Sequence, residues 1–306
     1  MNNPTSDKAL VGVFYARPDK TKKLLLALEN TDGVLEYFYR FFCDLPKEKA
    51  SEQIWANHRK TVEIIEGFLL KYPGILVVRE QNLGLSKNMI RSISEALEHH
   101  NSCVILEDDI IVSKKCLRHF EKALAQYEEH ENIWGIAGNS FLNEKESAKL
   151  PDSYMLPIMT TWGWATWADR WEKFLSQYPV SFEQMDNVKS IWGFDFGGFP
   201  YKQMLLDNRA GKVDSWAIEF NYTLFMNKGY FVFPKKSLCE NIGVGLDATH
   251  TLEQQQFMQK ITDDSYLPSQ YQENIDIEVI NAVSILFKKK LEKPGFSKRI
   301  VNRLFN

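Results

Sequence analysis

The sequence predicts an α/β protein in which a mostly parallel sheet is flanked by helices. Two observations lead to this fold class. Over the first 135 residues, short β-rich apolar runs alternate with stretches in which apolar residues recur at helical spacing. Polar or charged residues follow each expected strand, which is where open α/β sheets bind ligands. The chain has 306 residues, 44% of them apolar, which suffices for one large core or two modest ones.

In the first half of the chain we expect strands to alternate with helices. The expected strands are 10–15, 37–43, 75–78 and 103–106, and the expected helices are 20–29, 51–71 and 85–99. Because parallel strands need long crossover connections, this alternation favours a parallel sheet over hairpins.

After residue 135 the alternation of strands and helices becomes less regular. A strand is expected at 133–139, a helix at 220–227 and a strand at 229–233, with a long loop and a short helix over 181–213. No internal repeat or low-complexity linker interrupts the chain. The simplest organisation is therefore one domain with two halves, 1–135 and 136–270, followed by a tail at 271–306.

Composition excludes several classes of protein. No apolar run approaches the roughly 18 to 20 residues of a membrane-spanning helix, and the polar N-terminus lacks a secretory signal core. The four cysteines are widely spaced, which indicates reduced thiols and a cytoplasmic location. The net charge is −3, but residues 288–306 carry +6, which leaves −9 on residues 1–287. A body this acidic does not suit nucleic-acid binding.

An acidic triplet directly follows the fourth expected strand. Glu107, Asp108 and Asp109 are adjacent carboxylates that repel one another, so a shared cation would stabilise them. Oxygen ligands suit Mg²⁺ or Mn²⁺, which in turn suit a diphosphate. The alternative is a solvated acidic loop, or acids that favour the start of the next helix.

The residues around this triplet resemble a known family. The segments Val104-Ile-Leu-Glu-Asp-Asp-Ile-Ile-Val112, Trp134-Gly-Ile-Ala-Gly-Asn139 and Trp162-Gly-Trp-Ala-Thr-Trp167 are similar to those of GT-A-fold glycosyltransferases, with Asn241-Ile-Gly-Val-Gly and Thr249-His250 in support. The nearest likeness is to bacterial family-2-like transferases, and a more distant one is to N-acetylglucosaminyltransferase I. The resemblance spans roughly residues 10–252, and it implies a Rossmann-like GT-A domain.

The resemblance also implies a role for each candidate residue. Residues 1–135 would bind a nucleotide sugar, and 136–270 would bind the acceptor and carry catalysis. Asp109 would hold the metal at the donor diphosphate, Asp108 would lie near the ribose, and Glu107 would reach the ribose or the sugar. Arg17 and Asp44 would surround the nucleobase, with a uracil N–H donating to Asp44. The alternative for Asp44 is a turn cap before Pro46.

Other candidate residues complete the expected site. The turn Asn82-Leu-Gly-Leu-Ser-Lys87 opens a helix, whose first amides favour anions. Half of the eight tryptophans lie within 162–171, and we expect Trp162, Gly163 and Trp164 to line the acceptor pocket, although most tryptophans pack in cores. If 162–164 is extended, the two tryptophans share a face.

An inverting transfer needs a base for the acceptor hydroxyl. Relatives often carry an acid directly after the tryptophan of this segment, where this chain has Ala217, so Asp214 and Glu219 are the candidates. A helix cap is the alternative for Asp214, and a solvated helix face is the alternative for Glu219. His250 is a candidate metal ligand, and a surface or core histidine is its alternative.

The last residues are basic and apolar at once. Residues 284–306 have the composition of an interfacial segment on anionic lipid, which would attach the protein to the inner face of the cytoplasmic membrane. The alternative is a solvated helix packed on the body.

These features together predict a metal-dependent, inverting glycosyltransferase. We expect it to move a sugar from a nucleotide diphosphate donor, a UDP-sugar, to a glycan or lipid-linked glycan. Two other functions stay open at this point. One is a degenerate GT-A-fold protein that binds carbohydrate or membrane without catalysis. The other is a sugar-nucleotide nucleotidyltransferase, although Ala16-Arg-Pro-Asp19 lacks the glycines that such enzymes carry after their first strand.

Overall fold

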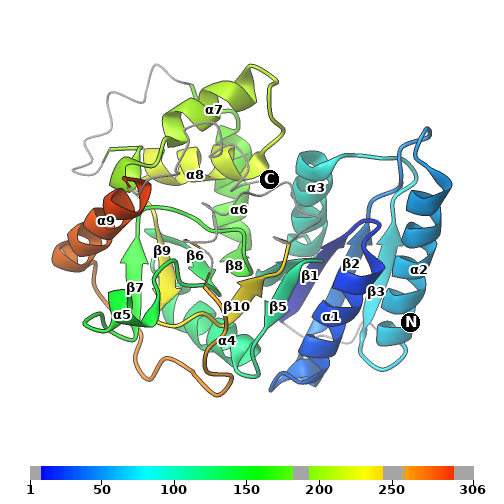
Figure 1. Ribbon diagram of the computed structural model, residues 1–306, viewed down its shortest axis with the longest axis horizontal. Helices are drawn as coiled ribbons and strands as arrows, with labels where there is room; N and C mark the ends of the chain where they lie inside the picture. The colour runs from blue at the N-terminus through cyan, green and yellow to red at the C-terminus, as the bar shows by residue number, and fades with distance from the viewer. Residues whose placement is uncertain (1–7, 182–192, 244–256, 258, 293–306) are drawn as a thin grey trace.

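The computed structural model describes residues 8–181, 193–243, 257 and 259–292. Its centre is an eight-stranded sheet in the order β3-β2-β1-β4-β8-β6-β9-β7 (Figure 1). The strands are β1 (Ala9–Phe14), β2 (Phe38–Cys43), β3 (Gly74–Val78), β4 (Ser102–Glu107), β6 (Ile133–Ala137), β7 (Ser153–Leu156), β8 (Trp164–Trp167) and β9 (Tyr230–Pro234). Four of the seven strand pairs are parallel, which confirms the predicted mostly parallel α/β sheet.

Helices cover this sheet. They are α1 (Pro18–Glu29), α2 (Glu52–Leu69), α3 (Leu85–Leu97), α4 (Cys116–Tyr127), α5 (Glu144–Ser147), α6 (Ala168–Gln177), α7 (Tyr201–Arg209), α8 (Trp216–Met226) and α9 (Ile277–Leu291). Short 3-10 turns, η1 (Val34–Glu36) and η3 (Phe196–Gly198), join some of them. In the parallel half every residue of β1 and β2 is buried, because helices cover both faces of these strands.

The strand order reverses between β1 and β4. The chain moves outward from β1 to β2 and β3, with α1 and α2 packed side by side (Figure 1), and then returns through α3 to β4. In the register, Val13 lies opposite Glu107 and Phe14 lies opposite Cys43. The residues that follow β1, β2 and β4 therefore meet at one edge, at the reversal point where such sheets bind ligands.

The second half adds antiparallel strands that the sequence analysis did not predict. The β8 strand lies between β4 and β6 and is antiparallel to both, and β7 pairs antiparallel with β9. A further pair, β5 (Ile110–Val112) with β10 (Cys239–Asn241), begins directly after Asp109.

In the first half, the predicted strands and helices agree with the observed ones to within about two residues at each end. The expected helix at 220–227 begins earlier, at Trp216. The expected boundary at residue 135 falls inside β6, which belongs to the same sheet as β1, so that sheet joins both halves.

The start of the basic tail is docked on the body. Helix α9 packs against η3 and β7, with Phe287 2% exposed and in ring contact with Phe141. Lys290 is also buried; it donates a hydrogen bond to the Phe141 carbonyl and forms an ion pair with Glu146. Residues 284–292 thus match the packed-helix alternative, and 293–306 lie outside the described residues.

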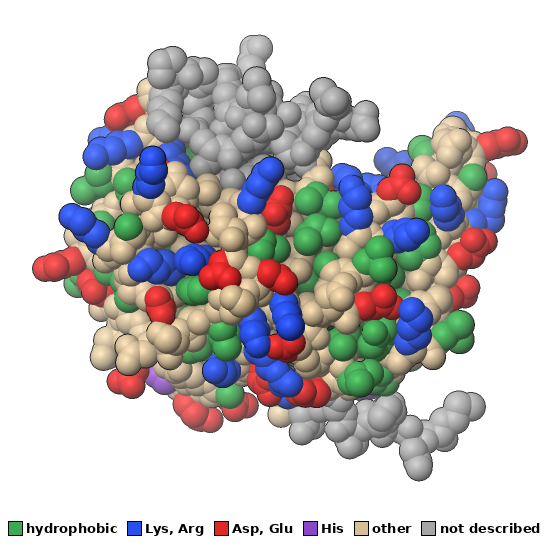
Figure 2. Space-filling model, turned by 60° about the horizontal axis from the view of Figure 1, so that its bottom comes forward, with side chains coloured by type: hydrophobic (Ala, Val, Ile, Leu, Met, Phe, Trp, Pro, Cys, Tyr) green, Lys and Arg blue, Asp and Glu red, His purple; other side chains and the backbone are tan. Residues whose placement is uncertain are grey.

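The surface carries charges of both signs. On the face in Figure 2, Lys and Arg side chains are interspersed with Asp and Glu rather than gathered into one basic patch. No helix among the described residues is long and apolar enough to cross a membrane.

Candidate active site

A cavity of about 480 Å³ opens at the carboxyl ends of β1, β2 and β4. It brings together most of the residues that the sequence analysis assigned to a donor site. Its lining consists of Val13, Phe14, Tyr15, Arg17, Asp44, Lys47, Asn82, Gly84, Leu85, Asn88, Glu107 and Asp108. Charged groups of both signs thus line one concave site at the reversal point of the sheet, the usual place for a ligand on such folds.

The acidic triplet is compensated by Arg17, which follows β1. Its Nε donates to Asp108 Oδ2 at 3.0 Å, and its Nη1 donates to Asp109 Oδ2 at 3.1 Å. Its Nη2 forms an ion pair with Asp108 Oδ1. Asp108 is 1% exposed, whereas the Arg17 side chain is 43% exposed. The guanidinium therefore binds a buried carboxylate and still reaches open space.

The charges in this cluster shift one another's pKa values. Burial raises the pKa of Glu107, repulsion from Asp109 adds to this, and attraction to Arg17 opposes it. Burial likewise raises the pKa of Asp108, although Arg17 opposes the shift. Burial opposes the charge on Arg17, but the two aspartates outweigh it and raise the pKa of Arg17. The site is thus short of positive charge.

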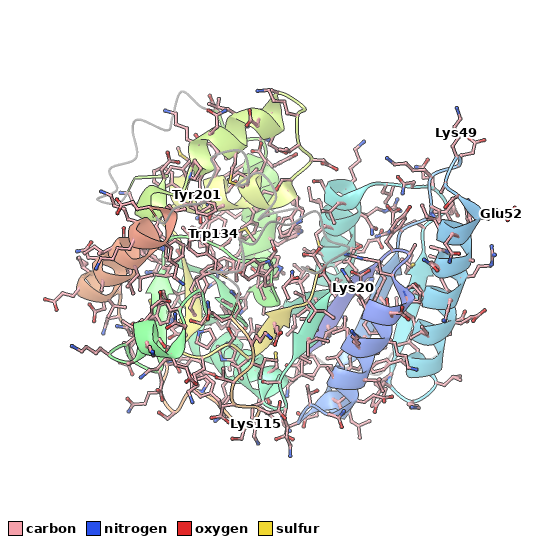
Figure 3. All side chains as sticks on the ribbon, in the orientation of Figure 1. Lys20, Lys49, Glu52, Lys115, Trp134 and Tyr201 are labelled. Carbon is pink, nitrogen blue, oxygen red and sulfur yellow. The ribbon has the colours of Figure 1, made fainter. Side chains whose placement is uncertain are left out.

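Lys20 has a weaker electrostatic effect on the acidic triplet than Arg17 has. Figure 3 shows it at the beginning of α1, at the end of that helix away from Lys115. Its charge lowers the pKa of Asp108 as the last of the causes that act on this group.

The donor set of this cluster fits a divalent cation. The described residues contain no group of three or more His, Cys, Asp or Glu side chains arranged to hold a metal ion. Asp108 and Asp109 nevertheless converge on a single cation, the Arg17 guanidinium. Mg²⁺ is commonly held by one or two carboxylates together with substrate phosphates and water. Asp109, with its side chain 13% exposed, is the more accessible of these two carboxylates for such an ion.

Asp109 lies under a loop from the second half of the chain. Ile242 N–H donates to the Asp109 carbonyl at 2.8 Å, and a Cβ on Gly243 would lie 2.3 Å from Asp109 Oδ2. Glycine at this position therefore avoids a clash with the carboxylate oxygen that Arg17 binds. His250, the other predicted metal ligand, lies outside the described residues.

Asp44 holds the loop between β3 and α3. Its carboxylate accepts hydrogen bonds from Leu83 N–H at 2.9 Å, Gly84 N–H at 3.0 Å and Asn82 Nδ2 at 3.2 Å. It also accepts from the neighbouring Leu45 N–H at 3.1 Å. Asp44 is 6% exposed, so these bonds use most of its capacity, in agreement with the turn-capping alternative.

The first turn of α3 borders the cavity, although not through Lys87. Gly84 and Leu85 line the cavity, whereas Lys87 is exposed and is not among the lining residues. Two lining residues that sequence reasoning missed are Lys47 and Asn88. Lys47 lies three residues after Asp44, in a loop whose proximity to the site could have indicated it.

The two candidate bases have different surroundings. Asp214 is exposed, and its Oδ2 lies 3.7 Å from the position of a Cβ on Gly84, which places it at the rim of the cavity. Helix α8 begins after Ser215, so Asp214 is not its cap. Glu219 is 3% exposed and accepts from Arg209 Nε at 2.9 Å and Nη2 at 2.7 Å. Glu219 is therefore a buried, paired carboxylate, whereas Asp214 is exposed, and the assignment of the base stays a prediction.

The tryptophan segment is core rather than an open pocket. Trp164 is 1% exposed and stacks on Trp216 with ring centroids 5.5 Å apart, which matches the core-packing alternative. Its contact with an acceptor stays a prediction. Gly163 has a φ of +73°, and this left-handed turn separates Trp162 from the face of Trp164.

A Cβ on Gly163 would lie 2.4 Å from Cys239 Sγ, so the absence of a side chain serves contact with this cysteine rather than with a ligand. Trp162, 8% exposed, lines a small apolar cavity with Phe141 and Phe287. Its role toward an acceptor stays a prediction.

Comparison with protein-family models and with curated proteins returns no match. Among solved structures, TarS of S. aureus is similar over 76% of this chain, with 13% identity and a TM-score of 0.43. A structure of TarS residues 1–349 is also similar over 76% of this chain, with 12% identity and a TM-score of 0.46. The chain spans 36% and 59% of those two structures.

A third similar structure is the mannosyltransferase PcManGT from Pyrobaculum calidifontis in complex with GDP-Man and Mn²⁺. It has 11% identity and a TM-score of 0.40 over 72% of this chain and 69% of its own. At these identities and scores, a shared activity does not follow.

Proposed function

We propose that this protein is a glycosyltransferase that moves a sugar from a nucleoside diphosphate to an acceptor hydroxyl. The observation that carries the proposal is the cavity at the reversal point of the sheet, which joins Arg17, Glu107 and Asp108 to an exposed carboxylate, Asp214, at its rim. A diphosphate needs cationic groups around it, and a sugar transfer needs a base beside it. The motif resemblance to GT-A enzymes points to the same reaction.

In the proposed reaction, Asp214 takes the proton of the acceptor hydroxyl as its oxygen attacks the anomeric carbon. The bond between that carbon and the diphosphate oxygen breaks, and the diphosphate leaves with the bonding electrons, which inverts the configuration. Arg17 and Lys47 are the cations of the cavity that stabilise the leaving charge. Asp109, with His250 as the second predicted ligand, would hold a bound Mn²⁺ or Mg²⁺, which would supply further positive charge at the diphosphate.

We propose a UDP-sugar as the donor and a glycan or lipid-linked glycan as the acceptor. A membrane-borne acceptor agrees with the basic residues 293–306, which follow the docked helix α9 and carry Lys293, Lys298, Arg299 and Arg303. Because α9 itself is packed on the body, this part of the tail is the one that we propose to bind anionic lipid at the membrane surface.

The test is calorimetric titration with UDP, GDP, dTDP and CMP, with and without Mn²⁺, followed by hydrolysis of the matching donor sugar. We expect one nucleotide to bind in a metal-dependent manner and Asp109→Ala to lose this binding. Asp214→Asn should bind the nucleotide normally but lose turnover by about 10²-fold or more. Glu63→Gln, on the exposed face of α2, is the matched control for a lost carboxylate.

Three outcomes would contradict the proposal. If no nucleotide binds, the donor site does not exist. If one binds but the wild type turns over no donor, the protein is a binding module rather than a transferase. Formation of a nucleotide sugar from a sugar phosphate would identify a nucleotidyltransferase.

A further inference from the structure

The cation already present at the acidic cluster is a side chain of the protein. Arg17 holds Asp108 through two N–H groups and Asp109 through one, Nη1 to Oδ2 at 3.1 Å. The interaction with Asp108 is bidentate, since two nitrogens of Arg17 bind the two oxygens of a carboxylate that is 1% exposed. The interaction with Asp109 is a single hydrogen bond to a side chain that is 13% exposed. The two contacts therefore differ in strength, and the Asp109 contact is the weaker.

A divalent cation at this cluster would share the Asp109 carboxylate with Arg17. Asp109 Oδ2 accepts from Nη1 of Arg17 and also lies close to Gly243, where a Cβ would be 2.3 Å away. A guanidinium and a metal ion that share one carboxylate also repel each other at short distance, more strongly in a cavity than in water. Metal binding at Asp109 is therefore coupled to the position of Arg17.

If Arg17 moves away from Asp109, its free N–H group can bind an anion in the cavity. Arg17 lines the cavity and 43% of its side chain is exposed, so its freed N–H can donate to an anion there without losing the bidentate interaction with Asp108. A diphosphate in the cavity would accept that hydrogen bond. Its arrival would thus release Asp109 for the metal.

We infer that Arg17 is the resident counter-ion of Asp109, and that a divalent cation binds by displacing Arg17 Nη1 from Asp109 Oδ2. Metal and diphosphate then bind cooperatively, because each favours the same displaced position of Arg17. This inference rests on the proposed function only for the nature of the anion. The competition between Arg17 and the metal involves no donor or acceptor.

The experiment is titration of the full-length protein with Mn²⁺ alone, followed by calorimetry or by the electron paramagnetic resonance signal of free Mn²⁺. We expect Arg17→Gln to bind Mn²⁺ on the order of tenfold more tightly than the wild type, because Asp109 has lost its competitor. Arg118→Gln, which removes an arginine paired with Glu36 on the surface, should leave Mn²⁺ affinity unchanged. Asp109→Ala should lose binding.

A second variant keeps the test valid if Arg17→Gln does not fold. In Arg17→Lys, a single ammonium can compensate Asp108 but cannot span both carboxylates, so Mn²⁺ should again bind more tightly than to the wild type. UDP should tighten Mn²⁺ binding to the wild type and do so less in either variant. Equal or weaker Mn²⁺ binding in these variants overturns the inference, as does no Mn²⁺ binding to any form. These outcomes leave the turnover test of the proposed function independent.

Discussion

The Asp44 carboxylate accepts the backbone N–H of Gly84 at 3.0 Å, and this bond joins the end of β2 to the beginning of α3. Gly84 has a φ of +77°, a left-handed conformation that turns its N–H toward Asp44. The same carboxylate accepts Leu83 N–H, so one side chain fixes both amides of the loop that borders the cavity.

Replacing Asp44 by Asn should loosen this loop. The amide has one acceptor oxygen in place of two, so the backbone N–H groups of Leu83 and Gly84 cannot both keep their partners. We expect the free energy of unfolding to fall by about 2 kcal/mol and nucleotide affinity to fall about tenfold. Urea unfolding and calorimetry measure the two effects, with Glu63→Gln as the control. Unchanged unfolding together with lost nucleotide binding would instead indicate direct contact between Asp44 and the base.

Glu219 and Asp214 should respond to amide substitution in opposite ways. Glu219→Gln leaves Arg209 without its buried partner, and we expect the free energy of unfolding to fall by about 3 kcal/mol. Asp214→Asn changes an exposed side chain and should alter it by less than about 0.5 kcal/mol, with turnover lost. A stable Glu219→Gln protein without turnover would identify Glu219 as the base.

Gly163 and Gly211 allow a comparison of how much a side chain at positive φ lowers the free energy of unfolding. Both have left-handed backbone, at +73° and +70°, but only the Cβ of Gly163 would meet Cys239 Sγ, and nothing lies within 4 Å of a Cβ at Gly211. We expect Gly211→Ala to cost about 1 kcal/mol and Gly163→Ala about 3 kcal/mol of unfolding free energy. Thermal or urea unfolding measures both. Equal costs would mean that Cys239 moves aside freely.

Stability should fall in acid because of His119. Burial lowers the pKa of His119 to about 4, against about 6.5 for an exposed histidine, although its bond to the Ala137 carbonyl opposes the shift. Between these two values the unfolded chain binds more protons than the folded one. The free energy of unfolding therefore decreases as pH falls from 6.5 to 4, by about 3 kcal/mol for this group.

Two variants isolate this contribution from those of other titrating groups. In His119→Gln the fall in unfolding free energy between pH 6.5 and 4 should be smaller than in the wild type. His99→Gln, at an exposed position, should keep the wild-type dependence. The same dependence in both variants would contradict the role of His119.

Membrane attachment should depend on residues 293–306 alone. Truncation after Glu292 keeps Phe287 and Lys290 in their buried contacts, so the shortened protein should fold normally. We expect full-length protein to float with phosphatidylserine vesicles and the truncated form to remain unbound, since each basic residue near such a surface contributes about 1 kcal/mol. Equal flotation of the two forms would exclude this segment, and flotation with neutral phosphatidylcholine vesicles would exclude its charge.

Sequence reasoning located the cavity because of a general property of parallel sheets. Residues after β1, β2 and β4 meet at one edge whatever their separation in the chain, and Arg17, Asp44 and Glu107 line the cavity as this property requires. The hydrogen-bond partners of each residue did not follow. That Arg17 binds Asp108, or that Asp44 caps the loop of Gly84, depends on side-chain positions that spacing does not specify.

The amino-acid sequence by itself determined the alternation of strands and helices in the first half and the edge at which the polar groups gather, because both depend on local pattern and strand direction. Tertiary structure decided the rest. Glu219 and Trp164 became core residues because Arg209 and Trp216 come from other elements to pack on them. Asp109 came to lie beside Gly243, 134 residues further along the chain, because β10 pairs with β5, a long-range contact that no local pattern encodes.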